Sequence, residues 1–381
     1  MVRPPSSRRD ALRMLGLGAL GLPLAGCGAA LWPGTNETPP IPPSPPPPLS
    51  TVPVEAAEVV AAPRGDRIER IPSERPVLLP NRLQAGGTIA LVSPAGVLRS
   101  RSQVDEAEDA LEDLGFRTTV GRHVLDRNGF LAGSDAARAR DLMDAFQDPD
   151  VDAIVAMRGG WGCARILPFL DYDEIAANPK PLVGYSDITA LLLAIYARTG
   201  LVTFHGPVGV STWRGLTRES FVRVLVDGEP PVIGPETRSN RDRTRAVRPG
   251  VAEGPVVGGN LTVMSALAGT GFLPDFDDHI VFFEEVGEDS YRIDRMLVQL
   301  QLAGLREPAG LAFGQCSNCG DGGSSWTAEE TIRRWLESYS CPSVLGAPIG
   351  HVSPVYTMPV GLRARLDAEA GTLEYLGSPV A

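Results

Sequence analysis

The stretch KPLVGYSDITALLLAIYARTGLVTFHG (Lys180–Gly206) decides the fold class of this chain of 381 residues. It holds a short apolar segment, PLVGY, then a Ser-Asp turn, the helix-length run ITALLLAIYARTG and a second apolar segment, LVTFH. Strand-like segments that alternate with helices of about 10–15 residues are typical of a parallel sheet with helices on its faces. The alternation begins near Gly87 and predicts an α/β domain over residues 84–214.

Ser186 lies at the turn between the predicted strand and the predicted helix. A serine there can cap the helix, or it can be a nucleophile held at a strand end. Functional side chains of parallel sheets gather at the carboxyl ends of strands. Two other strand ends carry suitable partners, because Glu284 and Glu285 follow HIVFF and His351 follows VLGAPIG. Such residues can form a relay in which histidine takes the serine proton and glutamate orients the imidazole.

The other three histidines are alternatives to His351. His205 also follows a predicted strand and remains open as a site residue. His123 lies in a β-like segment and His279 precedes a strand, so structural roles are favoured for both.

A glycine loop, MRGGWG (Met157–Gly162), follows the apolar strand DAIVA. Consecutive glycines expose backbone N–H groups, so this loop can supply one oxyanion donor, with the N–H of Asp187 as the other. The loop matches neither GxGxxG nor GxxxxGK[ST], which argues against nucleotide binding.

The second half of the chain is predicted to be a separate domain. Residues 215–252 are rich in Arg, Pro and Gly and are interpreted as a linker, and residues 253–381 again mix strands and helices. Within this domain, Cys316-Ser-Asn-Cys319 is a candidate disulfide in an exported protein. No second CxxC accompanies it in the sequence, so neither a zinc site nor any other metal site is predicted.

The N-terminus has the pattern of an export signal, predicted over residues 1–27. A twin-arginine pair precedes an apolar run too short to span a membrane, which ends in Leu-Ala-Gly-Cys. This tetrapeptide resembles a lipobox and makes Cys27 the predicted lipidation site. Residues 28–83 include PPIPPSPPPP and are predicted to be a disordered, proline-rich stalk. We expect a lipid-anchored protein of the cell envelope that faces the periplasm, on the outer membrane rather than the inner because Gly28 is not the retention aspartate.

The net charge of −11 disfavours binding to nucleic acid or to an anionic bilayer. Membrane contact is therefore expected through the lipid anchor only, and no cofactor is expected.

Six ordered motifs over residues 84–370 together resemble the LD-carboxypeptidase family of serine peptidases, which includes murein tetrapeptide carboxypeptidases and microcin C immunity peptidases. They are IALVSPAG, AMRGGWGCARIL, LVGYSDITALLLAIYARTGLVTFHGP, GGNLTVMSALAGT, FFEEVGEDSYRIDRMLVQL and PIGH. The resemblance implies a flavodoxin-like N-terminal domain and a smaller β-rich C-terminal domain, with the active site between them.

The resemblance also implies roles for particular residues. It makes Ser186 the nucleophile, Glu284 the acid and His351 the base, with oxyanion donors at the backbone N–H groups of Gly159 and Asp187. The implied reaction is cleavage of the LD-amide bond to the terminal D-alanine of peptidoglycan stem tetrapeptides. Candidate substrate contacts are Arg158, Trp161, Asn260, Tyr291 and Arg292.

Some of these assignments stay open. An arginine suits a substrate carboxylate, yet Arg292 can equally form a structural salt bridge, and Asn260 can be a turn residue. The chain departs from the family pattern at Val352, Cys163 and Glu285. Members of the family often form homodimers, and the periodicity of this sequence does not decide the oligomeric state.

Three alternative functions fit parts of the sequence. A microcin-type enzyme would hydrolyse a peptidyl nucleotide, and Trp161 or Trp213 could clamp its base. An α/β-hydrolase esterase shares the Ser–acid–His order, but Ile188 stands where the GxSxG motif has its second glycine. A non-catalytic murein-binding lipoprotein would lack a member of the relay, and all three candidates are present.

Overall fold

The computed structural model describes residues 76–235 and 243–381. The predicted signal, with Cys27, and the predicted stalk up to residue 75 lie outside the described residues. All described residues belong to one compact unit of the chain. Among them, no helix combines the length and the apolar character that crossing a bilayer requires.

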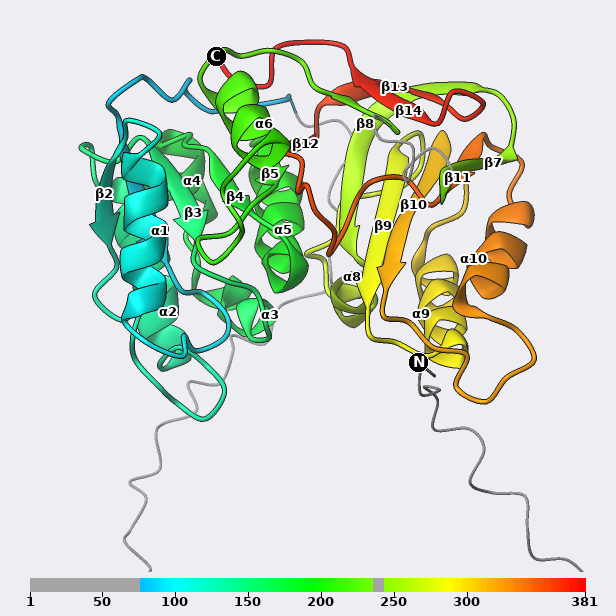
Figure 1. Cartoon of the computed structure of the whole chain (residues 1–381), viewed down its shortest axis with the longest axis horizontal. Helices are drawn as coiled ribbons and strands as arrows, with labels where there is room; N and C mark the ends of the chain where they lie inside the picture. The colour runs from blue at the N-terminus through cyan, green and yellow to red at the C-terminus, as the bar shows by residue number, and fades with distance from the viewer. Residues whose placement is uncertain (1–75, 236–242) are drawn as a thin grey trace, which may run out of the picture. The chain divides into compact units, whose positions relative to one another are not determined.

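A six-stranded sheet forms the first half of the described chain, with the order β12-β5-β4-β3-β1-β2 (Figure 1). Its strands are β1 (Thr88–Val92), β2 (Arg117–Val120), β3 (Ala153–Ala156), β4 (Leu182–Gly184), β5 (Thr203–His205) and β12 (Met358–Val360). The first five run parallel, and β12 is antiparallel to β5. The order 2-1-3-4-5 is that of flavodoxin-like folds, which confirms the predicted fold class.

Helices cover both faces of this sheet because residues along each strand point alternately to two apolar cores. On β1, Ala90 and Val92 join a core with α2 to α5, whereas Ile89 and Leu91 join a core with α1 and α6. The helices are α1 (Ser102–Glu112), α2 (Asp135–Gln147), α3 (Cys163–Ile166), η1 (Leu167–Phe169), α4 (Tyr172–Ala177), η2 (Ser186–Ile188), α5 (Thr189–Thr199) and α6 (Leu216–Leu225).

An eight-stranded mixed sheet forms the β-rich second half, with the order β6-β14-β13-β8-β9-β10-β11-β7. Its central strands β8 to β11 run parallel, and the outer pairs are antiparallel. The strands are β6 (Val232–Ile233), β7 (Arg245–Arg248), β8 (Val251–Asn260), β9 (Ile280–Val286), β10 (Gly310–Ser317), β11 (Ser343–Leu345), β13 (Arg363–Asp367) and β14 (Thr372–Tyr375). The helices are α8 (Leu261–Leu267), α9 (Ser290–Ala303) and α10 (Ala328–Glu337).

The predicted domain boundaries need three corrections. The segment 215–252 is not a linker, because α6 buries Phe221 in the first half and both β6 and β7 belong to the second sheet. The last residues of the predicted stalk are part of the fold, since Leu78 pairs with Leu201 and Leu83 is fully buried. The C-terminal part also returns one strand, β12, to the first sheet.

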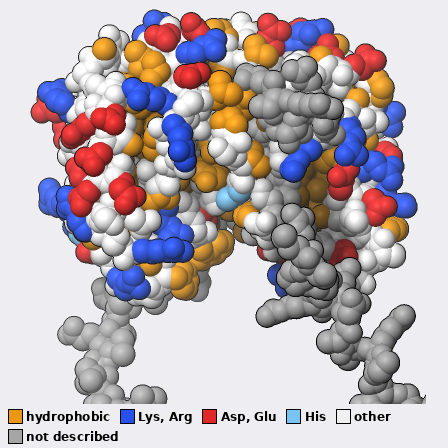
Figure 2. All heavy atoms as spheres, in the orientation of Figure 1, with side chains coloured by type: hydrophobic (Ala, Val, Ile, Leu, Met, Phe, Trp, Pro, Cys, Tyr) orange, Lys and Arg blue, Asp and Glu red, His pale blue; other side chains and the backbone are white. Residues whose placement is uncertain are grey.

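Acidic and basic side chains are interspersed on the face drawn in Figure 2, without a large patch of either sign.

Candidate active site

Ser186 stands at the turn after β4 in a left-handed backbone conformation, with φ 63°. This region is uncommon for a residue other than glycine. The chain can reverse here because Gly184 lacks a side chain: a Cβ there would lie 2.8 Å from Ile188 Cγ2. No side-chain cap hydrogen bond is formed at the start of η2 or α5. The helix-cap alternative for Ser186 is therefore not observed, and the hydroxyl stands at a strained strand-to-helix turn.

The glycine loop after β3 approaches this turn closely. A Cβ on Gly159 would lie 2.8 Å from Ser186 Cβ, 2.9 Å from its Oγ and 3.2 Å from the backbone nitrogen of Asp187. Only glycine permits this contact. It brings the backbone of both predicted oxyanion donors, Gly159 and Asp187, beside the serine side chain.

The carboxylate of Asp187 has a role that the sequence reasoning missed. It is buried, and its Oδ2 accepts a hydrogen bond from the backbone N–H of Cys163 at 2.8 Å. Burial raises the pKa of Asp187, and the hydrogen bond from Cys163 opposes that rise. The carboxylate therefore ties the end of the glycine loop to the turn that holds Ser186.

Arg158 and Trp161 belong to the same loop. The Nε of Arg158 donates to the carbonyl of Gly159 at 3.1 Å, and its Nη1 donates to the carbonyl of Val97 at 3.0 Å. The guanidinium thus fastens the glycine loop to the loop after β1. The side chain of Trp161 is 40% exposed, so its ring is available to a ligand.

Arg138 is a second support of the loop that sequence reasoning missed. Its side chain is fully buried, pairs with Asp135 and donates to the carbonyls of Pro94 and Gly162. The available signal was the position of an arginine on the apolar face of α2, one turn before Leu142. A charge in that position needs dedicated partners, because lone buried charges are costly.

Glu284 and His351 form a direct pair. The Oε2 of Glu284 accepts a hydrogen bond from His351 Nδ1 at 2.7 Å. Glu284 lies on β9 and is fully buried, and His351 lies in the loop after β11. Gly350 makes the approach possible, since a Cβ there would lie 2.9 Å from Glu284 Cβ. With Nδ1 bound to the carboxylate, Nε2 is the nitrogen left to accept a proton.

The surroundings of His351 favour its protonated form. Burial alone lowers the pKa of the imidazole, but the hydrogen bond and charge of Glu284, with the charge of Glu285, raise it above the ordinary value. The ring of Tyr185, next to the serine in sequence, lies 5.0 Å from the His351 ring. Among the described residues no hydrogen bond joins Ser186 Oγ to His351, a contact that in hydrolases often tightens only when substrate binds.

His205, the alternative histidine, is buried behind this pair. Its ring lies between Tyr185, at 6.0 Å, and Phe282, at 5.3 Å. Burial lowers the pKa of His205 to about 4, with a further contribution from His351 and an opposing one from Glu284. It is therefore neutral at pH 7 and not exposed to substrate.

Glu285 points to the opposite side of β9 from Glu284, as successive strand residues do. It accepts hydrogen bonds from the backbone N–H and the hydroxyl of Thr262, both at 2.8 Å, and from Asn260 Nδ2 at 3.2 Å. The Oδ1 of Asn260 caps α8 by accepting from the N–H of Val263. Asn260 is thus buried, and both polar atoms of its side chain have internal partners.

Tyr291 and Arg292 lie at the start of α9. Arg292 donates to the Tyr291 hydroxyl at 3.0 Å and pairs with Glu288 at 3.3 Å, so the structural salt bridge left open by the sequence is formed. Tyr291 is 52% exposed. Cys316 and Cys319 form a disulfide in the neighbouring loop.

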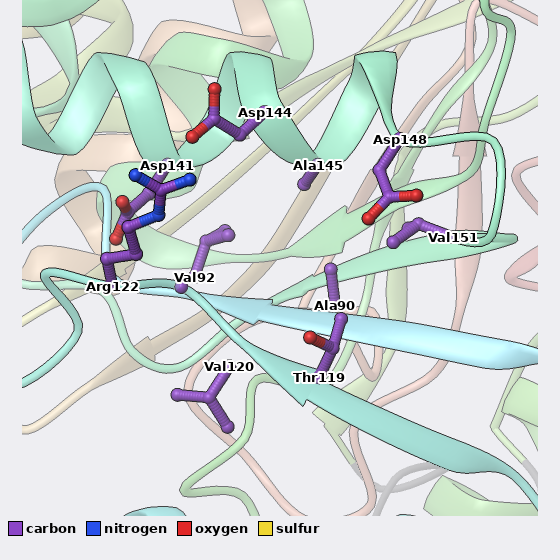
Figure 3. Close-up of a pocket in the computed structure, with 11 residues that line it drawn as sticks. Ala90, Val92, Thr119, Val120, Arg122, Asp141, Asp144, Ala145, Asp148 and Val151 are labelled. Atoms are coloured by element: carbon purple, nitrogen blue, oxygen red, sulfur yellow. The ribbon is translucent and has the colours of Figure 1, made fainter.

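The remaining candidates lie elsewhere. Trp213 packs its ring on Phe221 at 5.1 Å and donates Nε1 to the carbonyl of Val208 at 3.1 Å, so its role is structural. His123 pairs with the buried Asp141 at 2.7 Å. Asp141 lines a cavity of about 160 Å³ between β2 and α2, which none of the predicted site residues lines (Figure 3). Over residues 76–235 and 243–381, no cluster of side chains could hold a metal ion.

Comparison with known proteins gives a consistent result. Residues 89–206 match the LD-carboxypeptidase N-terminal domain, and residues 253–366 match the LD-carboxypeptidase C-terminal domain. The murein tetrapeptide carboxypeptidase of Pseudomonas aeruginosa is 34% identical over 303 residues, which cover 74% of this chain and 93% of that protein.

Solved structures agree with the sequence relatives. The muramoyltetrapeptide carboxypeptidase from Oxalobacter formigenes superposes with a TM-score of 0.66 at 30% identity, covering 76% of this chain and 97% of that one. The Escherichia coli microcin C7 self-immunity protein MccF is 28% identical over 76% of this chain and 93% of its own length. A structure of MccF in complex with glutamyl sulfamoyl guanosine gives a TM-score of 0.73 at 25% identity, covering 80% of this chain and 100% of that one.

Proposed function

This chain belongs to the LD-carboxypeptidase family, and on that premise we propose that it is a serine-type carboxypeptidase that releases the terminal D-alanine from peptidoglycan stem tetrapeptides. The observation that carries the proposal is the 2.7 Å hydrogen bond between Glu284 and His351, whose ring lies 5.0 Å from that of Tyr185, the residue before Ser186. A hydroxyl is a weak nucleophile at neutral pH, and this arrangement supplies the base that it needs.

In the proposed first step, Ser186 Oγ attacks the carbonyl carbon of the LD-amide while His351 Nε2 takes the hydroxyl proton. Negative charge develops on the carbonyl oxygen, and the N–H groups of Gly159 and Asp187 are the proposed donors that stabilise it. His351 then gives its proton to the nitrogen of D-alanine, the C–N bond breaks, and the shortened peptide remains as an ester of Ser186.

In the second step, water attacks the ester carbonyl and passes a proton to His351. The Ser186 Oγ–carbonyl bond then breaks, and Oγ takes that proton back, which restores the enzyme. Throughout both steps the Glu284 carboxylate holds Nδ1–H and stabilises the imidazolium that forms in each.

The full chain, purified in detergent, should be incubated separately with murein tri-, tetra- and pentapeptides. Release of D-alanine from the tetrapeptide alone is the expected result, and the Ser186→Ala variant should release none. If no peptide releases D-alanine but the chain binds these peptides measurably, the enzyme proposal is refuted in favour of a non-catalytic murein-binding lipoprotein.

A peptidyl-nucleotide amide is the second candidate substrate. The structural similarity to MccF and the exposed ring of Trp161 at the glycine loop favour testing it. Hydrolysis of such a compound at a higher kcat/KM than the tetrapeptide would reverse the order of the two candidates. If a Trp161→Ala variant loses hydrolysis of the peptidyl nucleotide but keeps that of the tetrapeptide, Trp161 is the ring that binds the nucleobase.

We also propose that the chain is exported and lipidated at Cys27, as its N-terminal sequence predicts. The residues concerned are outside the described structure, so the support is the twin-arginine pair and the Leu-Ala-Gly-Cys pattern. Labelling with radioactive palmitate should mark the wild-type chain and not a Cys27→Ser variant. Equal labelling of both would refute lipidation at this residue.

Peptidoglycan stem peptides are the proposed partners, and a homodimer is the proposed assembly. Sedimentation of the detergent-purified chain, with the detergent density-matched, should give the mass of two chains, and the mass of one chain would refute the dimer.

A further inference from the structure

The loop closed by the disulfide Cys316–Cys319 begins in the last two residues of β10, the strand that lies between β9 and β11 in the second sheet. β9 carries Glu284, and β11 leads to the loop of His351. In the register of the parallel pair, Cys316 stands opposite Glu285. The disulfide is therefore placed between the two elements that supply the acid and the base.

Ser317, enclosed by the two cysteines, bonds to both of those elements. Its Oγ donates to the carbonyl of His351 at 3.0 Å. Its own carbonyl accepts a hydrogen bond at 2.9 Å from the N–H of Gly287, three residues after Glu284. One residue earlier than the disulfide, the N–H of Gln315 donates to the carbonyl of Ile349 at 2.9 Å. The end of β10 is thus hydrogen bonded on one side to the base loop and on the other to the exit of β9.

The backbone of the loop has an unusual shape that the cross-link supports. Asn318 adopts φ 55°, in the left-handed region, which is costly for a residue other than glycine, although least so for asparagine. Beyond the disulfide, the N–H of Gly320 donates to the carbonyl of Glu288 at 3.0 Å, and Ser290 N–H donates back to Gly320 at 3.0 Å. A covalent closure of such a short loop removes alternative conformations in which Ser317 would turn away.

We propose that the disulfide loop Cys316–Cys319 is a positioning device for His351, which acts through Ser317 and makes hydrolysis depend on the oxidised state of the two cysteines. The proposal rests on the proposed function, since it assigns His351 the part of the base. Ser317 acts through its hydrogen bond to the backbone carbonyl of His351, so the proposal makes it a positioning residue and not a catalytic one.

The redox step is a simple exchange with an external dithiol. One thiolate of the dithiol attacks a sulfur of the Cys316–Cys319 bond and forms a mixed disulfide. Its second thiolate then displaces the other protein thiol, and the dithiol leaves as a cyclic disulfide. The protein gains two electrons and two protons as two thiols. Of the other cysteines in the described residues, Cys163 is buried and Cys341 is half-buried, and both are unpaired.

The first test compares variants of the full chain in tetrapeptide hydrolysis. Ser317→Ala removes the bond to His351 and should lower kcat about 3- to 10-fold, the effect of one ordinary hydrogen bond, with KM nearly unchanged. Ser317→Thr keeps a hydroxyl and should restore most of the rate. The matched control is Ser338→Ala, because Ser338 Oγ also donates to a backbone carbonyl, that of Trp335 at 2.6 Å, at the end of α10.

The second test addresses the disulfide itself. Treatment with dithiothreitol and the double change Cys316→Ser with Cys319→Ser should each reproduce the fall in kcat, while Cys341→Ser should not. The acid limb of the pH profile should also move to lower pH. A looser loop weakens the hydrogen bond between Glu284 and His351, which raises the pKa of the imidazole in the wild type. The pKa of His351 should therefore fall toward its ordinary value. The charges of Glu284 and Glu285 and the neighbouring Tyr185 and His205 still face the ring and limit this fall. A general loss of stability would not move this limb.

Reaction of Ser186 with a fluorophosphonate separates this inference from the proposed function, because it needs the relay and not the peptide. If reduction of the disulfide slows the labelling of Ser186, while no form of the protein hydrolyses the peptide, the positioning role is upheld and the proposed substrate is refuted. The positioning role is refuted if neither dithiothreitol nor Ser317→Ala changes the rate of peptide hydrolysis or the rate at which Ser186 is labelled. If the double cysteine variant does not fold, dithiothreitol acting on the folded wild-type chain decides the question.

Discussion

Adding a single methyl group at Gly159 should disable the site while leaving the fold in place. Gly159 is not among the residues of the described chain with positive φ, so alanine does not meet the left-handed conformation that disfavours it. What it meets is the nucleophile, because the new Cβ would lie 2.8 Å from Ser186 Cβ and 2.9 Å from Oγ. The perturbation is therefore steric and confined to the two elements that face each other in the site.

The expected size of the effect follows from these distances. Ordinary van der Waals contact begins near 3.4 Å, so the loop and the serine must separate by about 0.5–0.6 Å, which reaches the tolerance of about 0.5 Å within which catalytic groups must be held. Such a shift removes the N–H of Gly159 from the developing oxyanion. Loss of one oxyanion donor costs about 10²–10³ in rate, or about 3–4 kcal/mol. Overpacking should cost about 1–3 kcal/mol of stability.

The assay is D-alanine release from tetrapeptide, run beside fluorophosphonate labelling of Ser186 and thermal unfolding. The matched control is Gly377→Ala, since a Cβ at Gly377 meets nothing within 4 Å. The control should match the wild type in all three measurements. A Gly159→Ala enzyme that keeps more than about one tenth of the wild-type kcat/KM would refute the reasoning that places the oxyanion at this loop.

Three further predictions concern the nucleophile, the acid and a buried arginine. Ser186→Gly should abolish hydrolysis yet raise Tm by about 1–3 °C, because glycine relieves the left-handed strain; a lower Tm would contradict the strain. Glu284→Gln should lower kcat by up to about 10⁴-fold. It should also move the acid limb of the pH profile of kcat/KM to lower pH, because activity requires neutral His351 and the Glu284 carboxylate raises the pKa of His351 in the wild type. An acid limb that does not move would show that Glu284 does not control the pKa of the catalytic base. Arg138→Met should destabilise the fold by about 1–3 kcal/mol in urea unfolding, because it removes the donor to the carbonyls of Pro94 and Gly162. Arg165→Met removes an exposed partner of the same aspartate and should cost less than about 1 kcal/mol. Equal costs would contradict a role of buried Arg138 in supporting the glycine loop.

The strand-end logic located the main side chains from sequence. Ser186 follows β4, Glu284 lies near the end of β9, and His351 follows β11. The rule that functional side chains gather at the carboxyl ends of parallel strands selected them as candidates. Because β4 belongs to the first sheet and β9 and β11 to the second, the rule alone did not bring them together, and the family resemblance decided for His351 over His205. The glycine loop was selected as a source of one oxyanion donor in the same way, because it also follows a strand, whereas the choice of Gly159 within it came from the family resemblance.

The supporting contacts could not be read in this way, because they join segments that are remote in the sequence. The sequence around Arg138 does not indicate that its guanidinium will donate hydrogen bonds to the carbonyls of Pro94 and Gly162. The segment 215–252 was assigned as a linker from its composition, yet Phe221 is buried in a core with α1 and strands of the first sheet, which are remote from it in the sequence. The composition of a segment indicates how much of it is exposed to solvent on average. Which of its side chains are buried depends on which surface of the rest of the fold they cover.

A tight contact between the two halves explains how a nucleophile on one sheet can be aligned with a base on another. Thr189, three residues after Ser186, accepts a hydrogen bond on its Oγ1 from the N–H of Asn260 at 3.0 Å. A Cβ on Gly259 would lie 2.4 Å from that same oxygen, so the end of β8 meets the start of α5 without room for a side chain. Asn260 in turn bonds to Glu285, the neighbour of Glu284. The alignment of the relay is therefore set by backbone contact through a glycine, which tolerates less displacement than contacts between flexible side chains.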